Sequence, residues 1–554
     1  MKVISIINKT SHVPVQTLDC FVDKGYLQGT GGSLPDVDVD FQSDRRQEVK
    51  EYIERRYNHD GKQRVFSAGT FTTLKLKAVL KDVARVHRVP VNIVNYITAI
   101  FEDDNMSWTD LFTMAATNKK VHSFITEYPQ VIEDIRTLMG QPRSSSVHPS
   151  ALLVTPDSKD GKDLECFDFT PIKKIDGVLI SEFDGYSLDE QGLLKNDCLG
   201  IKELSKLQAV INICNDKYHT DITFQNIVQS GLDDPKVYQL LQKGYTQNIF
   251  QFSSKGMTKF LVSMQPDKIE DLIAANALFR PATLNSGSTD KYVDCKLGDA
   301  APVYLWGTYN AMKNTYGVLC YQEQLAQIAR EVGKFSLGEG VKLVKLISKK
   351  KVEKILALRD KFMTGANENG CPKEDAEAIW HMFEVAGGYL FNKSHATAYA
   401  VTAYAGAYLK ANYPTAFYTI ALQWAKDDEI PTLMSEMELC SEAKIVPPDI
   451  NVSGGTFITD YETNKIFWSL SRIKMLGAKA TEWIINERNV RGEFSSIENF
   501  IERIFRYKLK LYKYWDDPDN PNEATKCPVN ARHVRHLILS GCFDKTENAQ
   551  SVIE

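Results

Sequence analysis

The first regular pattern of hydrophobic and polar residues is LPDVDVDF at 34–41, where apolar and acidic residues alternate. Residues two apart on a β-strand share one face, so the pattern predicts a strand with Asp36, Asp38 and Asp40 on one side. The intervening valines would then face a core.

Helical spacing follows this strand. DRRQEVKEYIERRY at 44–57 and TLKLKAVLKDVARVHR at 73–88 both predict helices. The apolar face of the second helix is expected to consist of Leu76, Val79, Leu80, Val83 and Val86.

Short strands precede a long helical region. SALLVTP at 150–156 predicts a strand, and residues 177–200 predict a strand, a loop and a second strand with Asp197 near a strand end. Helical patterns dominate from 200 to 445. PPDI at 447–450 then interrupts them, and a small α/β segment with paired helices follows. This order predicts a multidomain, helix-rich α+β protein.

Composition narrows the class of protein. A chain of 554 residues is too long for one core, so about three or four domains are expected. The net charge of -5 argues against a surface that coats nucleic acid everywhere. Ten cysteines without a C-x-x-C pair favour free thiols in a reducing cytoplasm. The weakly polar run at 396–409 is too short to span a membrane and predicts a buried helix.

The acidic strand is a candidate metal site. Closely spaced carboxylates repel one another unless a cation lies between them, and hard oxygen ligands suit Mg²⁺ or Mn²⁺. An exposed acidic strand or a calcium loop would show the same pattern. Asp197 is a candidate third carboxylate, and Lys195, two residues earlier, would share its face and meet a triphosphate. The alternative is a turn aspartate beside a solvated lysine.

These segments resemble the alpha subunit of bacterial DNA polymerase III, a C-family polymerase. The matching segments, in the family's order, are LPDVDVDFQSDRRQEVKEYIERRY (34–57), KAVLKDVARV (77–86), SVHPSALLV (146–154), LLKNDCLGI (193–201), IFQFSSKGM (249–257), ALFRPATLNSG (277–287), TYGVLCYQEQLAQIA (315–329), FNKSHATAYAVTAYAGAYLKANYP (391–414) and VPPDIN (446–451). So many ordered matches make the resemblance specific.

The resemblance implies a polymerase-beta-like nucleotidyltransferase palm with an inserted helical thumb, large helical fingers and a C-terminal tandem helix-hairpin-helix region. The expected boundaries are an unmatched segment at 1–32, palm at 33–70 and 146–205, thumb at 71–145, fingers at 206–450 and the duplex-binding hairpin region at 451–554.

The resemblance also assigns the site. It implies Asp36, Asp38 and Asp197 as ligands of two Mg²⁺ ions, with Mn²⁺ as a substitute, whereas Asp40 is not a principal ligand. The residues implied to approach the incoming nucleotide are Lys195, Arg280, Tyr389, Asn392, Lys393 and His395. His395 would suit protonation of the leaving group; the alternative is a buried structural histidine.

Basic residues gather locally in this acidic chain. Lys77, Lys81 and Arg85 recur every four residues and predict one helical stripe for DNA phosphates. A second basic cluster contains Lys349, Lys350 and Lys351. Residues 473–485 predict a helix, a turn at Gly477 and a second helix, a hairpin that presents N–H groups to a phosphate. Solvated faces and ordinary helical turns are the alternatives.

The sequence therefore predicts a DNA polymerase that uses Mg²⁺, dNTPs and a primer–template, with no membrane and with a sliding clamp or other replisome proteins as partners. Departures from the family leave an alternative open. No Gly-Ser palm segment is recognised before Ser33, so the chain is alternatively a DNA-binding fragment that awaits an N-terminal partner polypeptide. A hydrolase with paired carboxylates is the third hypothesis. The divergence favours a distant member, bacterial or phage-encoded, in the cytoplasm of a bacterium or of a phage-infected host.

Overall fold

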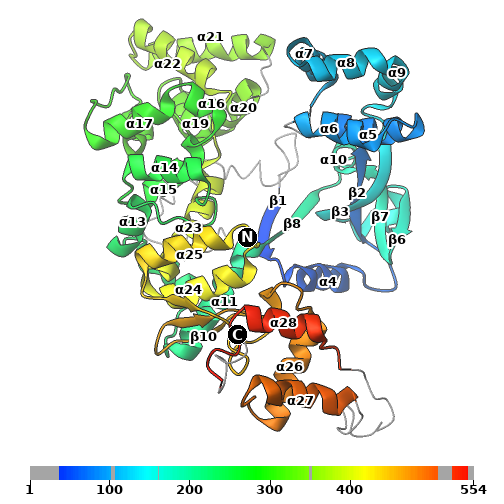
Figure 1. Ribbon diagram of the computed structural model, residues 1–554. Coiled ribbons are helices and arrows are strands. Elements are labelled where there is room, and N and C mark those ends of the chain that lie inside the picture. Colours follow the sequence, from blue (N-terminus) through cyan, green and yellow to red (C-terminus); the bar gives the residue numbers. More distant parts are fainter. Residues whose placement is uncertain (1–36, 102–105, 160, 349–351, 509–526, 547–554) are drawn as a thin grey trace. The chain divides into compact units, whose positions relative to one another are not determined.

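The computed structural model describes residues 37–101, 106–159, 161–348, 352–508 and 527–546 (Figure 1). The described residues form two compact units. One ends at Lys202, and the other begins at Glu203. Predictions for residues 1–32, Asp36 and Lys349–Lys351 lie outside the described residues.

The N-terminal unit contains a six-stranded sheet with the order β1-β8-β3-β2-β7-β6. Its strands are β1 Val37–Gln42, β2 Val65–Thr73, β3 Pro142–Val154, β6 Ile172–Ile175, β7 Val178–Asp184 and β8 Lys195–Ile201. The pairs β1–β8 and β2–β7 are parallel, and the other neighbours are antiparallel. The unit's other elements are α4 Arg46–Tyr57, α5 Leu76–Val86, α6 Val91–Ile100, α7 Trp108–Thr117, α8 Lys119–Glu127, α9 Pro129–Leu138, α10 Gly185–Glu190, the pair β4 Ser158–Lys159 and β5 Lys162–Asp163, and the 3-10 turn Cys166–Asp168.

Helices α5 to α9 are inserted between β2 and β3 and have a hydrophobic core of their own. Leu76, Val79, Leu80 and Val83 are buried in it, as their helical spacing predicts. Val86 is a correction, because 76% of it is exposed. It is the last residue of α5, where the helix has already passed the core.

Strand β2 was not predicted from the sequence. Its first five residues are all buried, so the strand lacks the alternation of a sheet with one wet face. Gly69 allows its close approach to β7, since a Cβ there would lie 2.5 Å from the carbonyl oxygen of Ser181 and 2.9 Å from that of Phe183. A larger residue at this position would push the two strands apart.

The C-terminal unit is mainly helical. Its helices before residue 441 are α11 Lys202–Lys217, α12 Phe224–Gln229, α13 Pro235–Gln242, α14 Lys255–Met264, α15 Ile269–Leu278, α16 Pro281–Asn285, α17 Ser288–Leu297, α18 Tyr309–Met312, α19 Gln322–Glu331, α20 Leu337–Ser348, α21 Val352–Glu368, α22 Lys373–Ala386, α23 Lys393–Asn412, α24 Pro414–Trp424 and α25 Ile430–Cys440, with a 3-10 turn at Lys313–Thr315.

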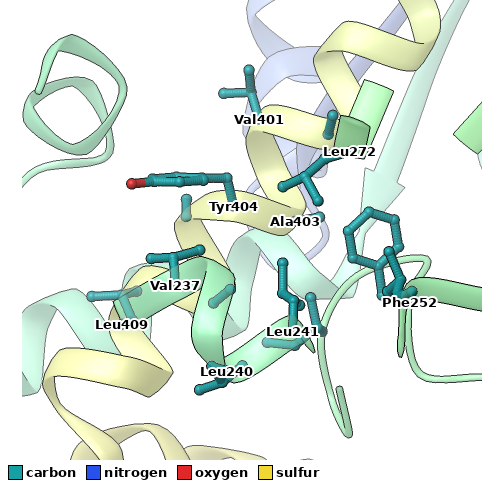
Figure 2. Packing of buried hydrophobic residues seen from close by; sticks show 14 of the residues in the cluster. Val237, Leu240, Leu241, Phe252, Leu272, Val401, Ala403, Tyr404 and Leu409 are labelled. Atoms are coloured by element: carbon teal, nitrogen blue, oxygen red, sulfur yellow. The ribbon is translucent and has the colours of Figure 1, made fainter. Parts of the chain in front are cut away.

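Helix α23 is the central element of this unit's largest core. Figure 2 shows Tyr404 and Leu409 of α23 near Val237 of α13, within one cluster of buried residues. Burial of each such large apolar side chain contributes about 1.5–3 kcal/mol. The prediction of a buried helix at 396–409 is confirmed. Within the described part of the chain, no helix is both long and apolar enough to cross a membrane.

A small α/β segment follows, as predicted. It contains a three-stranded sheet, β10-β11-β9, and helices packed on a separate core. Its elements are β9 Lys444–Val446, β10 Ile458–Asp460, β11 Lys465–Phe467, the 3-10 turn Leu470–Arg472, α26 Ala478–Arg491, α27 Ile497–Lys508 and α28 Ala531–Leu539.

The predicted hairpin at 473–485 is half correct. Helix α26 follows Gly477 as expected, but the element before it is the short 3-10 turn Leu470–Arg472. Met475 adopts a left-handed backbone conformation, with φ 72°, which ends any helical path before Gly477.

Candidate functional site

The first candidate site lies where β1 pairs with β8. The two strands run parallel, and their register places Asp38 opposite Asp197. β3 pairs with β8 on its other side and places Ala151 opposite Asp197. The sequence predicted both aspartates on strands. Their pairing joins segments almost 160 residues apart, which strand periodicity alone does not predict.

Asp197 is buried and held by two partners. Its Oδ1 accepts a hydrogen bond from the Ser150 hydroxyl at 3.0 Å, and its Oδ2 lies 2.8 Å from the Lys195 ammonium. Burial raises the pKa of Asp197, but hydrogen bonds from Lys195 and Ser150 outweigh it, so the pKa lies below its ordinary value. The carboxylate is therefore ionised at neutral pH. Lys195 lies beside it, as predicted from their spacing.

Two residues of this site were missed from the sequence. Ser150 donates to Asp197, and the His148 ring nitrogen Nδ1 lies 4.0 Å from the same carboxylate oxygen. Nδ1 also accepts the Ala151 N–H at 3.0 Å, so a neutral ring carries its proton on Nε2. Burial lowers the pKa of His148. Both residues lie in the segment SVHPSALLV (146–154), so the available signal was a polar pair directly before the apolar run of the strand.

The donor set at this site fits a hard cation. Asp197 offers an ionised carboxylate, and Asp38 is its register partner on β1. Asp40 is opposite Leu199, two positions farther along. Among the described residues, no group of three or more His, Cys, Asp or Glu side chains gathers as a metal cluster; Asp36 lies outside them.

A second cluster forms in the C-terminal unit around the turn before α23. Arg280 lies with its guanidinium 4.5 Å from the centre of the Phe391 ring. Its Nε donates to the Ala277 carbonyl at 2.9 Å, and its Nη2 donates to the Tyr389 carbonyl. The Tyr389 hydroxyl accepts a hydrogen bond from Ser288 at 3.2 Å. The structure thus brings Arg280 and Tyr389 together from distant segments.

The predicted residues after Tyr389 form the start of α23. Asn392 caps the helix, because its side-chain oxygen accepts the His395 N–H at 2.9 Å. Lys393 places its ammonium 5.6 Å from the centre of the Tyr321 ring. His395 is exposed, and its ring lies 4.1 Å from that of Tyr399. The alternative of a buried structural histidine is therefore wrong.

The predicted DNA contacts on α5 differ in exposure. Lys81 and Arg85 are exposed, and Arg85 pairs with Asp82 at 3.4 Å. Lys77 is half-buried, and its ammonium donates to the Phe101 carbonyl at 3.4 Å. Gly477 is exposed at the N-terminus of α26. Two of the three stripe residues are thus accessible to a ligand.

The described elements define a helix-rich α+β protein. A family model for the helix-hairpin-helix motif matches residues 442–513, which adds this motif to the class. Two further family models identify the family. The bacterial DNA polymerase III alpha NTPase domain matches residues 13–200, and the alpha subunit finger domain matches residues 203–370. The chain belongs to the bacterial DNA polymerase III alpha-subunit family. The NTPase match includes residues 13–32, which were expected to be part of an unmatched segment.

Curated relatives agree with this assignment. DNA polymerase III subunit alpha of Aquifex aeolicus is 32% identical, with 95% of this chain and 45% of the relative covered. The subunit of Campylobacter jejuni is 32% identical, with 93% and 41% covered, and that of Borreliella burgdorferi is 33% identical, with 94% and 42% covered. The chain spans less than half the length of these relatives.

Proposed function

We propose that the chain is a template-directed DNA polymerase that extends a primer 3′ end with dNTPs by two-metal nucleotidyl transfer. The register pair of Asp38 and Asp197, with Lys195 beside Asp197, carries the proposal. The relatives' name, DNA polymerase III subunit alpha, supports it.

The proposed domains follow the described elements. The six-stranded sheet suits a palm at 33–70 and 146–205, and helices α5 to α9 suit an inserted thumb at 71–145. Helices of the C-terminal unit suit fingers at 206–450, and residues 451–554 suit duplex binding through helix hairpins. A sliding clamp or other replisome proteins would act as partners.

Each side chain of the palm site has a task in this reaction. Asp38 and Asp197, with Asp36, would hold two Mg²⁺ ions, which when bound activate the primer hydroxyl and stabilise the pyrophosphate leaving group. Ser150 fixes one oxygen of Asp197 and so orients the carboxylate. Lys195, paired with the other oxygen, is placed to exchange that contact for a triphosphate oxygen.

The second cluster, around the turn before α23, would supply cations for the phosphates. Arg280 and Lys393 lie in one unit with Tyr389, and both pack on aromatic rings that restrict their rotamers. Positive charge held in place stabilises negative charge on the transferring phosphate without reorganisation. His395, exposed at the first turn of α23, is placed to give a proton to the leaving group.

Primer extension tests the proposal. The purified chain is expected to extend a labelled primer on a template with four dNTPs and Mg²⁺, and to stop on addition of EDTA. Mn²⁺ should restore extension. Tight binding of primer–template without any incorporation would contradict the proposal and favour the alternative, a fragment that requires a second polypeptide. Cleavage of DNA without incorporation would favour a hydrolase.

Neutralising the α5 stripe is expected to weaken DNA binding without changing sequence preference. Lys81→Ala combined with Arg85→Ala removes two exposed cations, so the slope of log K against log salt should fall by about 2. Fluorescence anisotropy with a labelled primer–template from 50 to 300 mM salt measures that slope. Lys162→Ala, an exposed lysine on β5, is the control. An unchanged slope would remove the stripe from the proposed DNA path.

A further inference from the structure

A buried carboxylate lies at the start of α23 and has no role in the functional assignment above. Glu323 of α19 is 4% exposed. Its Oε1 accepts the backbone N–H of Lys393 at 2.8 Å and that of Ser394 at 3.3 Å. Its Oε2 accepts no hydrogen bond in the described part of the chain. A buried carboxylate with one unpaired oxygen requires a physical explanation.

The segment around Glu323 is fixed against the turn before α23. The Gln322 N–H donates to the Phe391 carbonyl at 2.9 Å, and the Phe391 N–H donates to the Cys320 carbonyl at 2.9 Å. Gln324 adds rigidity, because its Oε1 accepts the N–H groups of Cys320 and Tyr321, both at 2.9 Å. The carboxylate is therefore held in one place relative to the first turn of α23.

Ionised Glu323 lowers the stability of the fold. Burial raises its pKa from 4.5 to about 7, although the Lys393 and Ser394 N–H groups and the Lys393 charge oppose this rise. Between these two pKa values the folded state binds more protons than the unfolded state, so stability falls as pH rises through this window. A group that costs stability at neutral pH, in a segment proposed to bind the nucleotide, is a candidate for a functional role.

Several charged and titratable groups lie near Glu323, and most of them keep the same charge near neutral pH. Lys393 of α23 faces it, and Cys320 and Tyr321 lie in the preceding segment. Burial raises the pKa of both Cys320 and Tyr321, so both are neutral at pH 6 to 8. Arg280 is a further cation near Cys320 and stays charged in this range. Of Glu323, Cys320 and Tyr321, Glu323 is thus the group whose charge changes near pH 7.

The carboxylate also occupies the anion site of the helix. A helix N-terminus binds phosphates through its first free N–H groups. At α23 the N–H groups of Lys393 and Ser394 donate to the Glu323 carboxylate, and the N–H of His395 donates to the Asn392 side chain. A triphosphate that approaches this turn must therefore bind side chains.

We propose that Glu323 is a positioning residue for nucleotide binding, which holds the first turn of α23 so that the side chains of Lys393 and His395 meet the triphosphate. This inference rests on the proposed polymerase function. Glu323 does not touch the substrate in this proposal. It acts through the orientation of the turn.

The Glu323→Gln variant of the full chain tests the inference. At pH 8 the KM for dNTP in primer extension should rise about tenfold, as expected for one weakened charge-assisted hydrogen bond, with kcat within about threefold of wild type. At pH 6, where wild-type Glu323 is protonated, the two KM values should converge. The variant should also be at least as stable as wild type at pH 8, because the buried charge is gone.

A matched control variant and two possible results test the positioning role of Glu323. Glu331→Gln changes another carboxylate of α19, which accepts from Gln327 at 2.8 Å, and should leave KM unchanged. An unchanged KM in Glu323→Gln overturns the inference. A higher KM with a lower melting temperature at both pH values also overturns it, because that result marks a structural role.

Hydrogen exchange separates this inference from the proposed function. If the wild-type chain incorporates no dNTP, the polymerase proposal fails while Glu323 is still testable. In Glu323→Gln the peptide containing the Lys393 and Ser394 amides should exchange faster at pH 8 than in wild type, and at an equal rate near pH 6 after correction for intrinsic rates. Equal exchange at both pH values overturns the positioning role.

Discussion

The Asp197→Asn variant is expected to lose dNTP incorporation by about 10³-fold or more while it remains folded. Asparagine keeps the shape of the side chain and an oxygen that accepts from Ser150, but it removes the negative charge that Lys195 contacts and that a metal requires. Single-nucleotide incorporation under saturating dNTP measures the loss. Asp38→Asn should cause a loss of similar size, because Asp38 is the register partner of Asp197.

Asp40→Asn is the matched control for these variants. It lies on the same strand, two residues beyond Asp38, and is opposite Leu199, so its incorporation rate should stay within about threefold of wild type. Primer–template binding should be unchanged in all three variants. An Asp197→Asn chain that retains a tenth of the wild-type rate would exclude Asp197 as a metal ligand.

The pH dependence of stability gives a second measure of Asp197. Its pKa lies below the ordinary value of 3.8, so the ionised group contributes stability above that value and loses it as pH falls through the folded-state pKa. The stability difference between wild type and Asp197→Asn should therefore be largest at neutral pH and should shrink as pH falls through the folded-state pKa of Asp197. Thermal unfolding at several pH values measures it.

The sequence predicted those elements whose hydrophobic pattern lies within a single helix or strand. The alternation in LPDVDVDF and the spacing of Leu76, Val79, Leu80 and Val83 express single-element periodicities, and both elements form. Strand β2 was missed because it is buried on both faces at its start, which removes alternation. The pairing of β1 with β8 is a contact between distant segments, and no local pattern encodes it.

The cluster around the turn before α23 shows the same difference between local and tertiary information. Arg280 and Tyr389 were proposed as nucleotide contacts from ordered motifs, and the structure shows that they touch. Glu323 was overlooked because an acidic residue in the first turn of a helix is usually exposed and favourable to the helix dipole. Its burial results from the packing of Phe391 and the start of α23 against α19, which is a tertiary effect.

The Lys410→Met variant is expected to lower the free energy of unfolding of the C-terminal unit by about 3–5 kcal/mol. The Lys410 side chain has no exposed surface, and its ammonium donates to the carbonyls of Tyr245 and Gln247, at 3.0 and 2.8 Å, and to Glu436. Burial lowers its pKa, and Glu436 opposes that effect. Methionine fills a similar volume but leaves the two carbonyls and the buried carboxylate without their cation.

A second substitution distinguishes two causes of lost stability: loss of the contact between Lys410 and Glu436, and burial of the Glu436 charge without a cation. In Lys410→Met with Glu436→Gln the uncompensated carboxylate is absent, so the double variant should recover at least half of the lost stability. Lys342→Met, at an exposed position of α20, should change stability by less than about 0.5 kcal/mol. Urea unfolding followed by tryptophan fluorescence measures all three. Glu436 also accepts the Gln247 N–H at 3.0 Å and a hydrogen bond from the Tyr418 hydroxyl at 3.0 Å. If these contacts contribute more than the unpaired charge costs, the double variant will be less stable than Lys410→Met. That result would contradict the argument.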